Sequence, residues 1–250
     1  MKKTIALLLL GVMLLPLCAC GKSEAVQAVE DMIAGLGPIY IESEALLDDL
    51  NSAYKALSEK EQTQVENLEQ YQEALETFMY ISEQVDYYEA LREDAIARKD
   101  FYSVVAICDE LTAFTQKKEL LDATESVKEL ALECCYEGTY VPKFNIVVGA
   151  NNLADATIRD GKYPDPDTYW HSYTFKSSSK MQAVFEIYLE CIKDSDYFSA
   201  CIPPREMESF DYIHYYFKDP HGNALTLTTL EASILGQYIV EVKYDMAMHR

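Results

Sequence analysis

The sequence predicts an α+β fold, in which an all-α N-terminal region is followed by a small, mainly antiparallel sheet domain with one packed helix. Apolar residues recur at intervals of three and four along residues 25–138, as on one face of an α-helix. Along residues 139–250 they mostly alternate, as in half-buried β-strands. Several strands with a single helical pattern between them are typical of a sheet that packs one helix on one face.

Residues 1–19 have the composition of a secretory signal peptide. Lys2 and Lys3 precede an apolar run over residues 5–17. A membrane-spanning helix needs about 20 apolar residues. A charged start and a short apolar core are typical instead of a signal that is removed after export.

The end of this run resembles a known lipidation motif. Leu17-Cys18-Ala19-Cys20 is similar to the lipobox of bacterial lipoproteins, in which a cysteine after a small residue receives a diacylglyceryl group. The resemblance implies cleavage before Cys20, a lipid-anchored tether over residues 20–24, and a location on the outer face of the cell membrane. Two acyl chains anchor a protein stably, whereas one chain holds it only marginally. The alternative is an ordinary signal peptide cleaved at Ala19.

The chain is strongly acidic, with 42 acidic against 21 basic residues and a net charge of −21. Residues 25–135 carry 25 acidic and 8 basic residues, whereas residues 136–250 carry 16 and 10. An acidic surface repels phosphate backbones and anionic headgroups, so the composition disfavours nucleic-acid binding. The uneven charge also indicates at least two structural units.

The helical region begins with a predicted helix over residues 25–33 and a second helix after Ser43. The segment 58–61 has the spacing of a capping box, in which Ser and Glu side chains satisfy each other's backbone donors. The segment 67–70 repeats this spacing before a longer helix. Residues 25–79 are therefore expected to form one helical module.

This module resembles a small helical unit of surface proteins from Gram-positive bacteria. In that unit a helix ending in Ala-Tyr-x-x-Leu-Ser is followed by a Val-x-Asn turn. The matching segments are Ala53-Tyr54-Lys55-Ala56-Leu57-Ser58 and Val65-Glu66-Asn67. The resemblance implies a spacer or presentation module rather than a catalyst.

Residues 80–135 are predicted to form a helical hairpin that continues the helical domain to residue 138. The segment 100–111 resembles the second helix of a tetratricopeptide-type unit. It departs from that family at Lys99, where glycine is usual, at Val104, where a small residue is usual, and at Cys108, where an aromatic residue is usual. A plain helical hairpin is the alternative.

The α+β domain over residues 139–250 is predicted to contain six strands and one helix. Pro203 and Pro204 are expected to end the third strand, and Asp219–Gly222 to form a tight turn in which His221 is only a turn residue. The predicted strands are residues 140–148, 169–175, 197–202, 212–217, 224–230 and 238–244. The helix follows a cap at residues 177–179, and its apolar stripe is Met181, Val184, Phe185, Tyr188, Leu189 and Ile192.

Five cysteines follow Cys20, so at least one thiol has no partner within the exported chain. Cys134 and Cys135 are adjacent, which is a poor geometry for a disulfide. Cys191 on the predicted helix and Cys201 on the next strand are one candidate pair. Buried thiols that behave as small apolar side chains are the alternative.

The sequence contains no recognisable catalytic or cofactor motif, such as a Gly-rich phosphate loop, a nucleophile elbow or a Cys-x-x-Cys pair. No cofactor or metal is therefore expected. His171 and His214 lie on predicted strands, without Cys or carboxylate partners at zinc-ligand spacing. The acidic loop 160–167 carries the oxygen ligands that calcium prefers. Its spacing matches no EF-hand pattern, and a solvated acidic loop is the alternative.

An aromatic run is the candidate ligand-contact site. On a strand, Tyr169, His171 and Tyr173 lie on one face, and Trp170 lies on the other. One face must join the core, and the other can stack on a sugar or hold a peptide. Chance placement among 19 tyrosines is the alternative.

These features together predict a non-enzymatic, lipid-anchored binding or adaptor protein. An acidic helical stalk would present the α+β domain to a protein, peptide or cell-wall glycan partner. Two alternatives stand beside this prediction. One is a cell-envelope hydrolase or processing factor with a site built from carboxylates and tyrosines, and the other is a structural spacer without a ligand.

Overall fold

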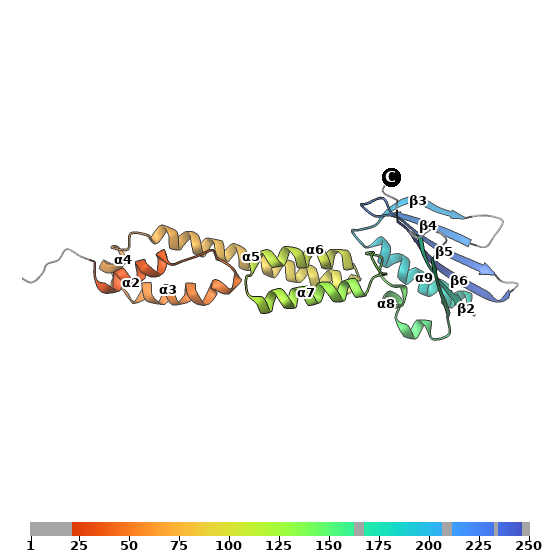
Figure 1. Ribbon diagram of the computed structural model, residues 1–250, viewed down its shortest axis with the longest axis horizontal. Helices are drawn as coiled ribbons and strands as arrows, with labels where there is room; N and C mark the ends of the chain where they lie inside the picture. The colour runs from red at the N-terminus through yellow and green to blue at the C-terminus, as the bar shows by residue number, and fades with distance from the viewer. Residues whose placement is uncertain (1–21, 163–167, 207–211, 233–234, 247–250) are drawn as a thin grey trace, which may run out of the picture. The chain divides into compact units, whose positions relative to one another are not determined.

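The computed structural model describes residues 22–162, 168–206, 212–232 and 235–246. Helices in the N-terminal part precede a six-stranded antiparallel sheet, so the predicted α+β class is confirmed (Figure 1). The predicted signal peptide and Cys20 lie outside the described residues. The chain forms two compact units, residues 1–85 and 86–250. None of the helices in the described ranges combines the length and apolar character needed to span a membrane.

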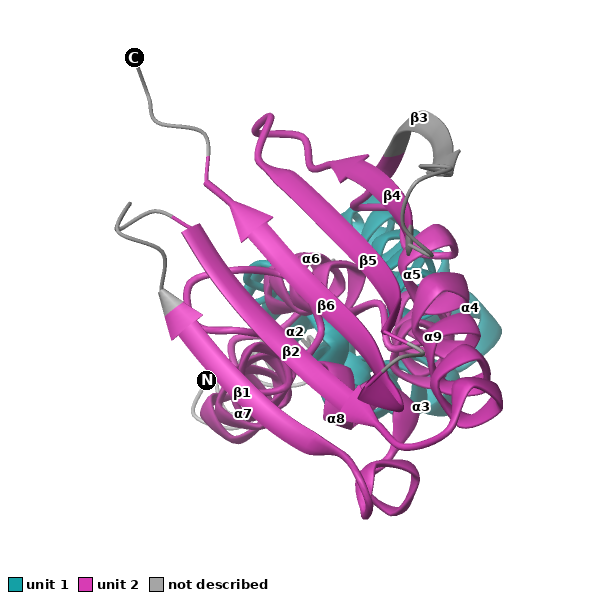
Figure 2. Ribbon diagram, turned by 90° about the vertical axis from the view of Figure 1, so that its right-hand side faces the viewer, with its two compact units in different colours: residues 1–85 teal, residues 86–250 magenta. Residues whose placement is uncertain are grey.

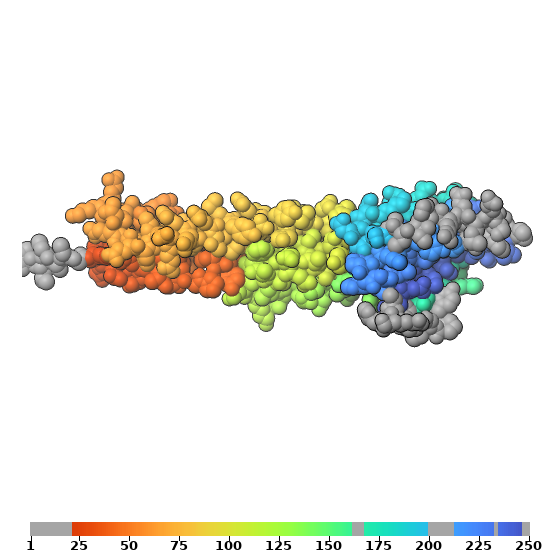
Figure 3. All heavy atoms as spheres, turned by 90° about the horizontal axis from the view of Figure 1, so that it is seen from above, coloured from red at the N-terminus to blue at the C-terminus, as the bar shows by residue number. Residues whose placement is uncertain are grey.

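The first unit is a small helical bundle. It contains α2 (Glu24–Ala34), η1 (Ile41–Ser43), α3 (Glu44–Ala56), α4 (Glu59–Gln62) and the first part of α5 (Leu68–Arg98). Figure 3 shows α2 and α3, in red and orange, packed directly against the start of α5. The core of this unit consists of Val26, Val29, Ile33, Leu47, Leu50, Leu57, Val65, Tyr71 and Ala74.

One of the two predicted capping boxes forms. The Ser58 amide donates to Glu61 Oε2 at 2.9 Å, and the Glu61 amide donates to Ser58 Oγ at 3.4 Å. The predicted box at Asn67 is wrong, because Asn67 Oδ1 accepts no hydrogen bond from the described residues. The side-chain NH2 group of Asn67 donates to the backbone oxygen of Glu30 at 3.0 Å. The Glu66 amide donates to the Glu30 carboxylate at 2.7 Å. The Val-x-Asn turn therefore ties the start of α5 to α2.

The second unit begins with the C-terminal part of α5 and a helical hairpin. The hairpin consists of α6 (Phe101–Leu111) and α7 (Lys118–Glu133), joined through η2 (Thr112–Phe114). Lys99 separates α5 from α6 in the left-handed region, with φ of 63°, and its amide donates to the backbone oxygen of Ile96. The hairpin core consists of Ala95, Phe101, Val104, Val105, Cys108, Ala131 and Cys135.

The sheet has the strand order β1-β2-β6-β5-β4-β3, and every neighbouring pair is antiparallel. Helix α9 and the short α8 lie on one face, and the other face carries no helix of the described part of this unit (Figure 2). The strands are β1 (Thr157–Lys162), β2 (Thr168–Phe175), β3 (Ser199–Glu206), β4 (Tyr212–Lys218), β5 (Ala224–Ala232) and β6 (Gln237–Asp245), and the helices are α8 (Phe144–Val148), η3 (Ala150–Leu153) and α9 (Ser178–Lys193).

The apolar stripe predicted for α9 is confirmed, because all six of its residues are buried. They pack on the alternate buried residues of the central strands, such as Leu225 and Leu227 of β5 and Val240 and Val242 of β6. The strands predicted at 169–175, 212–217, 224–230 and 238–244 are confirmed as β2, β4, β5 and β6. The period-two pattern therefore predicted the strands that have one buried face.

Three predictions in this domain are wrong. Residues 140–148 do not form the predicted strand. Pro142 instead forms an isolated bridge with Cys135, and Phe144–Val148 form the helix α8. Pro203 and Pro204 do not end the third strand, because β3 is an edge strand whose register shifts accommodate them. The predicted acidic loop 160–167 overlaps the end of β1, because Asp160–Lys162 form its last three residues. An edge strand with exposed side chains lacks the apolar alternation that marks central strands.

A buried carboxylate holds the β4–β5 turn. Asp219 accepts hydrogen bonds from the hydroxyls of Tyr197 at 3.0 Å and Tyr244 at 2.7 Å. It also accepts from the backbone and side-chain amides of Asn223, at 2.9 and 2.7 Å. Burial alone would raise the pKa of Asp219, but these hydrogen bonds outweigh it and lower the pKa below its ordinary value. Gly222 completes the predicted turn with φ of 84°.

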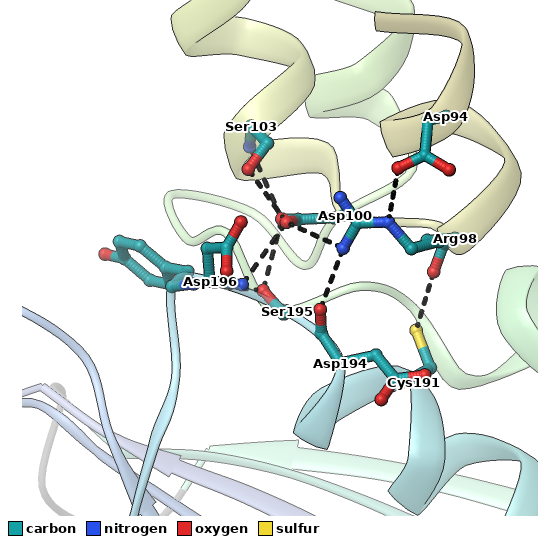
Figure 4. Close-up of polar contacts among 9 residues, drawn as sticks. Asp94, Arg98, Asp100, Ser103, Cys191, Asp194, Ser195 and Asp196 are labelled. Atoms are coloured by element: carbon teal, nitrogen blue, oxygen red, sulfur yellow. Dashed lines mark hydrogen bonds and ion pairs between the residues drawn. The ribbon is translucent and has the colours of Figure 1, made fainter. Parts of the chain in front are cut away.

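A second buried carboxylate joins the hairpin to the sheet domain within the second unit (Figure 4). Asp100 is 2% exposed and caps α6 by accepting from the Ser103 amide at 3.3 Å and the Ser103 hydroxyl at 2.8 Å. Its carboxylate also accepts from the Ser195 hydroxyl at 3.1 Å and the Asp196 amide at 3.3 Å. The same side chain therefore fixes the start of α6 and the loop after α9.

Neighbouring contacts support this junction. The Arg98 guanidinium donates to the backbone oxygen of Asp194 at 2.9 Å, and the Cys191 thiol donates to the backbone oxygen of Arg98 at 3.6 Å. Cys191 is a free thiol, and burial raises its pKa to about 12. The side chain of Cys201 lies outside the described residues. Cys108, Cys134 and Cys135 are also free thiols.

We expect Asp100→Ala to lower the free energy of unfolding of the second unit by about 2–4 kcal/mol. The substitution removes a helix cap, which is worth about 1 kcal/mol, and leaves buried donors without an acceptor, at roughly 1–3 kcal/mol. Urea unfolding followed by Trp170 fluorescence measures the change, since Trp170 is the only tryptophan. Glu93→Ala is the control. Glu93 is an exposed carboxylate of the same helix, α5, and is not one of the residues described above at this junction, so the expected loss is under about 0.5 kcal/mol. Equal losses would contradict the role of Asp100.

Candidate functional site

A pocket of about 960 Å³ lies in the second unit, between the C-terminal end of α7, the loop that follows it, and strands β1 and β2. Glu129 and Glu133 come from successive turns of α7. Tyr136 comes from the loop, which the Cys135–Pro142 bridge closes. The pocket therefore combines groups that are up to about 40 residues apart in the sequence.

The wall on the sheet side is an ordered stack of polar and aromatic groups. Antiparallel register places Asp160 of β1 directly opposite His171 of β2, and His171 Nδ1 lies 2.8 Å from Asp160 Oδ1. The His171 ring stacks on Tyr136, with ring centroids 4.0 Å apart and planes at 17°. The carboxylate and the phenol ring together fix the orientation of the imidazole.

Hydrogen bonds hold Tyr136 in turn. Its hydroxyl lies 3.1 Å from the Tyr173 hydroxyl and accepts from the Phe144 amide at 3.1 Å. Burial raises the pKa of both tyrosines, so both hydroxyls stay protonated across the physiological range. The Tyr136 ring is thus positioned from the loop, the sheet and α8 simultaneously.

The pocket is acidic. Glu129, Glu133, Glu137 and Asp160 line it, and all four residues are exposed to solvent. Lys143 also lines the pocket, and its ammonium group donates to the backbone oxygen of Glu133 at 2.7 Å. The pocket therefore offers carboxylates and aromatic faces, which together attract a positively charged group.

The four residues of the aromatic run lie in three different environments. Tyr169 and His171 line the pocket. Tyr173 shares their face but is 3% exposed, and its ring stacks on Phe144 in the core at 4.4 Å. Trp170 lies on the opposite face of the sheet, where its indole covers Gly161. The expectation that one whole face would be core and the other free is thus too simple, because one strand face is pocket at one end and core at the other.

The other predicted site residues are not brought together. His171 on β2 and His214 on β4 have two strands, β6 and β5, between them and lie on opposite faces of the sheet, so they share no site. The imidazole of His214 interacts with Thr228 Oγ1 at 2.8 Å. His221 is an exposed turn residue whose backbone amide donates to Asp219. Of the acidic loop, residues 163–167 lie outside the described residues. Elsewhere in the described ranges no three metal-binding side chains converge.

Sequence reasoning missed Tyr136 and the carboxylates of α7. Glu129 and Glu133 are spaced by four residues, which places them on one helix face, and Glu137 follows four residues later. This spacing was the available signal. It did not show which strand faces those carboxylates, because that depends on how the hairpin packs on the sheet.

Comparisons of the chain with protein-family models, with characterised proteins and with solved structures find no match. The fold and the site therefore define the class of molecule: an α+β protein with an acidic, aromatic pocket at one side of its sheet.

We expect Gly161→Ala to destabilise the protein by about 1–3 kcal/mol, because a methyl group there would collide with the Trp170 indole. The test is a double-mutant cycle with Trp170→Ala, followed by urea unfolding and circular dichroism. With the indole removed, Gly161→Ala should cost little. An equal cost in both backgrounds would show that the indole does not rest on Gly161.

Proposed function

We propose that the protein is a lipid-anchored, non-enzymatic binding protein on the outer face of the cell membrane, and that its pocket holds a positively charged group of a partner. The observation that carries the proposal is the acidic pocket with its fixed His171–Tyr136 wall. Aromatic faces and carboxylates bind ammonium and guanidinium groups well, through cation–π and charge interactions. Lysine or arginine side chains and amino sugars carry such groups.

The hydrolase alternative is less well supported by the geometry. A His–Asp pair orients the base in many hydrolases, but it activates a nearby nucleophile. The thiol that lines this pocket, Cys135, donates to the backbone oxygen of Ala131 at 3.5 Å, and burial raises its pKa to about 12. Such a thiol is protonated at neutral pH and is a poor nucleophile. The pocket carboxylates are exposed, whereas general-acid carboxyl groups are usually buried.

The anchor is tested on the intact chain in a bacterial host. Cys20→Ala should abolish labelling by radioactive fatty acid and leave the unprocessed precursor, because the thiol that accepts the lipid is missing. Cys18→Ala is the matched control and should be labelled like the unchanged protein, since Cys18 leaves with the signal. Labelling that persists in Cys20→Ala would exclude this cysteine as the anchor.

The pocket is tested with short oligolysine peptides titrated into the protein by calorimetry. Removing pocket charges with Glu133→Gln and Glu137→Gln together should weaken binding about 2–30-fold, at roughly 0.2–1 kcal/mol for each of the two exposed ion pairs. Added salt should reduce affinity for the unchanged protein.

Glu125→Gln is the control for this experiment. Glu125 is an exposed carboxylate of the same helix that does not line the pocket. If one such neutralisation outside the pocket weakened binding as much as the pocket substitutions, the attraction would come from the overall charge of the chain, and the pocket proposal would fail.

A further inference from the structure

We propose that an extended basic peptide adds as a further strand to the outer edge of β1, beyond which the described residues place no strand, and directs a lysine or arginine side chain into the pocket. This inference rests on the proposed function and names its partner as a peptide rather than a glycan. The two edges of the sheet differ in how well they could accept another strand.

The edge formed by β3 is closed to another strand. Its pairing with β4 shifts register between Ala200 and Ile202, and again between Ile202 and Arg205. Pro203 and Pro204 lie within this strand and lack amide donors. Bulges and prolines are the usual means by which proteins protect an exposed edge from pairing.

The edge strand β1 has neither a bulge nor a proline. Its pairing with β2 is continuous from Thr157–Thr174 to Lys162–Tyr169, without a register shift, and the strand contains no proline. In the part of the chain that the structure describes, no further strand pairs with its other side. An unpaired strand edge presents alternate backbone donors and acceptors, which an extended peptide can satisfy.

Position connects this edge to the pocket. Asp160 and Gly161 of β1 line the pocket, so the pocket reaches the edge strand. An added strand would lie about 4.8 Å from β1 and direct alternate side chains to the face on which the pocket opens. Ile158, which is 49% exposed, would supply an apolar neighbour for a cross-strand side chain.

The negative charge of the pocket favours a basic peptide as the partner at the β1 edge. The pocket carboxylates Glu129, Glu133, Glu137 and Asp160 favour a basic strand and disfavour an acidic one. A second copy of this chain would meet the first with a net charge of −21 on each molecule, and such acidic copies repel. A basic peptide is therefore favoured over self-association through β1.

The test uses the full chain and the capped peptide Thr-Val-Lys-Val-Thr in two N-methylated forms. The amides of the first, third and fifth residues of a strand point to one edge, and those of the second and fourth point to the other. Methylation of the set that faces β1 should weaken binding at least about tenfold, because each backbone hydrogen bond contributes on the order of 1 kcal/mol. Methylation of the other set should change it by less than about threefold.

The outcomes separate this inference from the function on which it rests. If the two methylated peptides bind equally well, while replacing the lysine by glutamate abolishes binding, the pocket binds cations but strand addition is overturned. If the unmethylated peptide and oligolysine both fail to bind, the proposed function fails as well. If sedimentation shows a dimer that the peptide dissociates, the occupant of the edge is a second copy, and the basic-peptide inference is overturned.

Discussion

The buried carboxylate of Asp100 connects parts of the second unit that the chain itself leaves far apart. Burying a charge is costly unless hydrogen bonds replace its hydration, and Asp100 obtains those bonds from α6 on one side and from the loop after α9 on the other. These two sets of hydrogen bonds together tie the hairpin to the sheet domain. The pocket depends on that connection, since its walls come from α7 on the hairpin and from β1 and β2 on the sheet.

The predictable parts of the fold are those in which one side of an element is buried. Helix α9 shows this most clearly, because its six apolar residues repeat at helical spacing and all six are buried. Strand β1 offers no such signal, since its pairing uses backbone groups and its apolar residue Ile158 is about half exposed. The pattern of residues 140–148 led to the wrong prediction of a strand, because the spacing of Phe144 and Val148 fits one face of a short helix as well as one face of a strand. In the structure both residues lie in the core on the helix α8.

The site was only partly predictable for a related reason. The sequence placed Tyr169 and His171 on one strand face, and they do line the pocket. Tyr136 and the glutamates of α7 could not be assigned to it, because local periodicity does not show which helix end faces which strand. The pairing of Asp160 with His171 required the β1–β2 register, and thus required a strand that the pattern had not revealed.

The fixed position of the Tyr136 ring affects both the rate of ligand association and the conformational entropy lost on binding. Its ring is held by three separate parts of the unit before any ligand arrives. A preorganised surface loses little conformational entropy on association, and encounters need not wait for a side chain to find its rotamer. Differences in affinity between partners would then come mainly from differences in their dissociation rates.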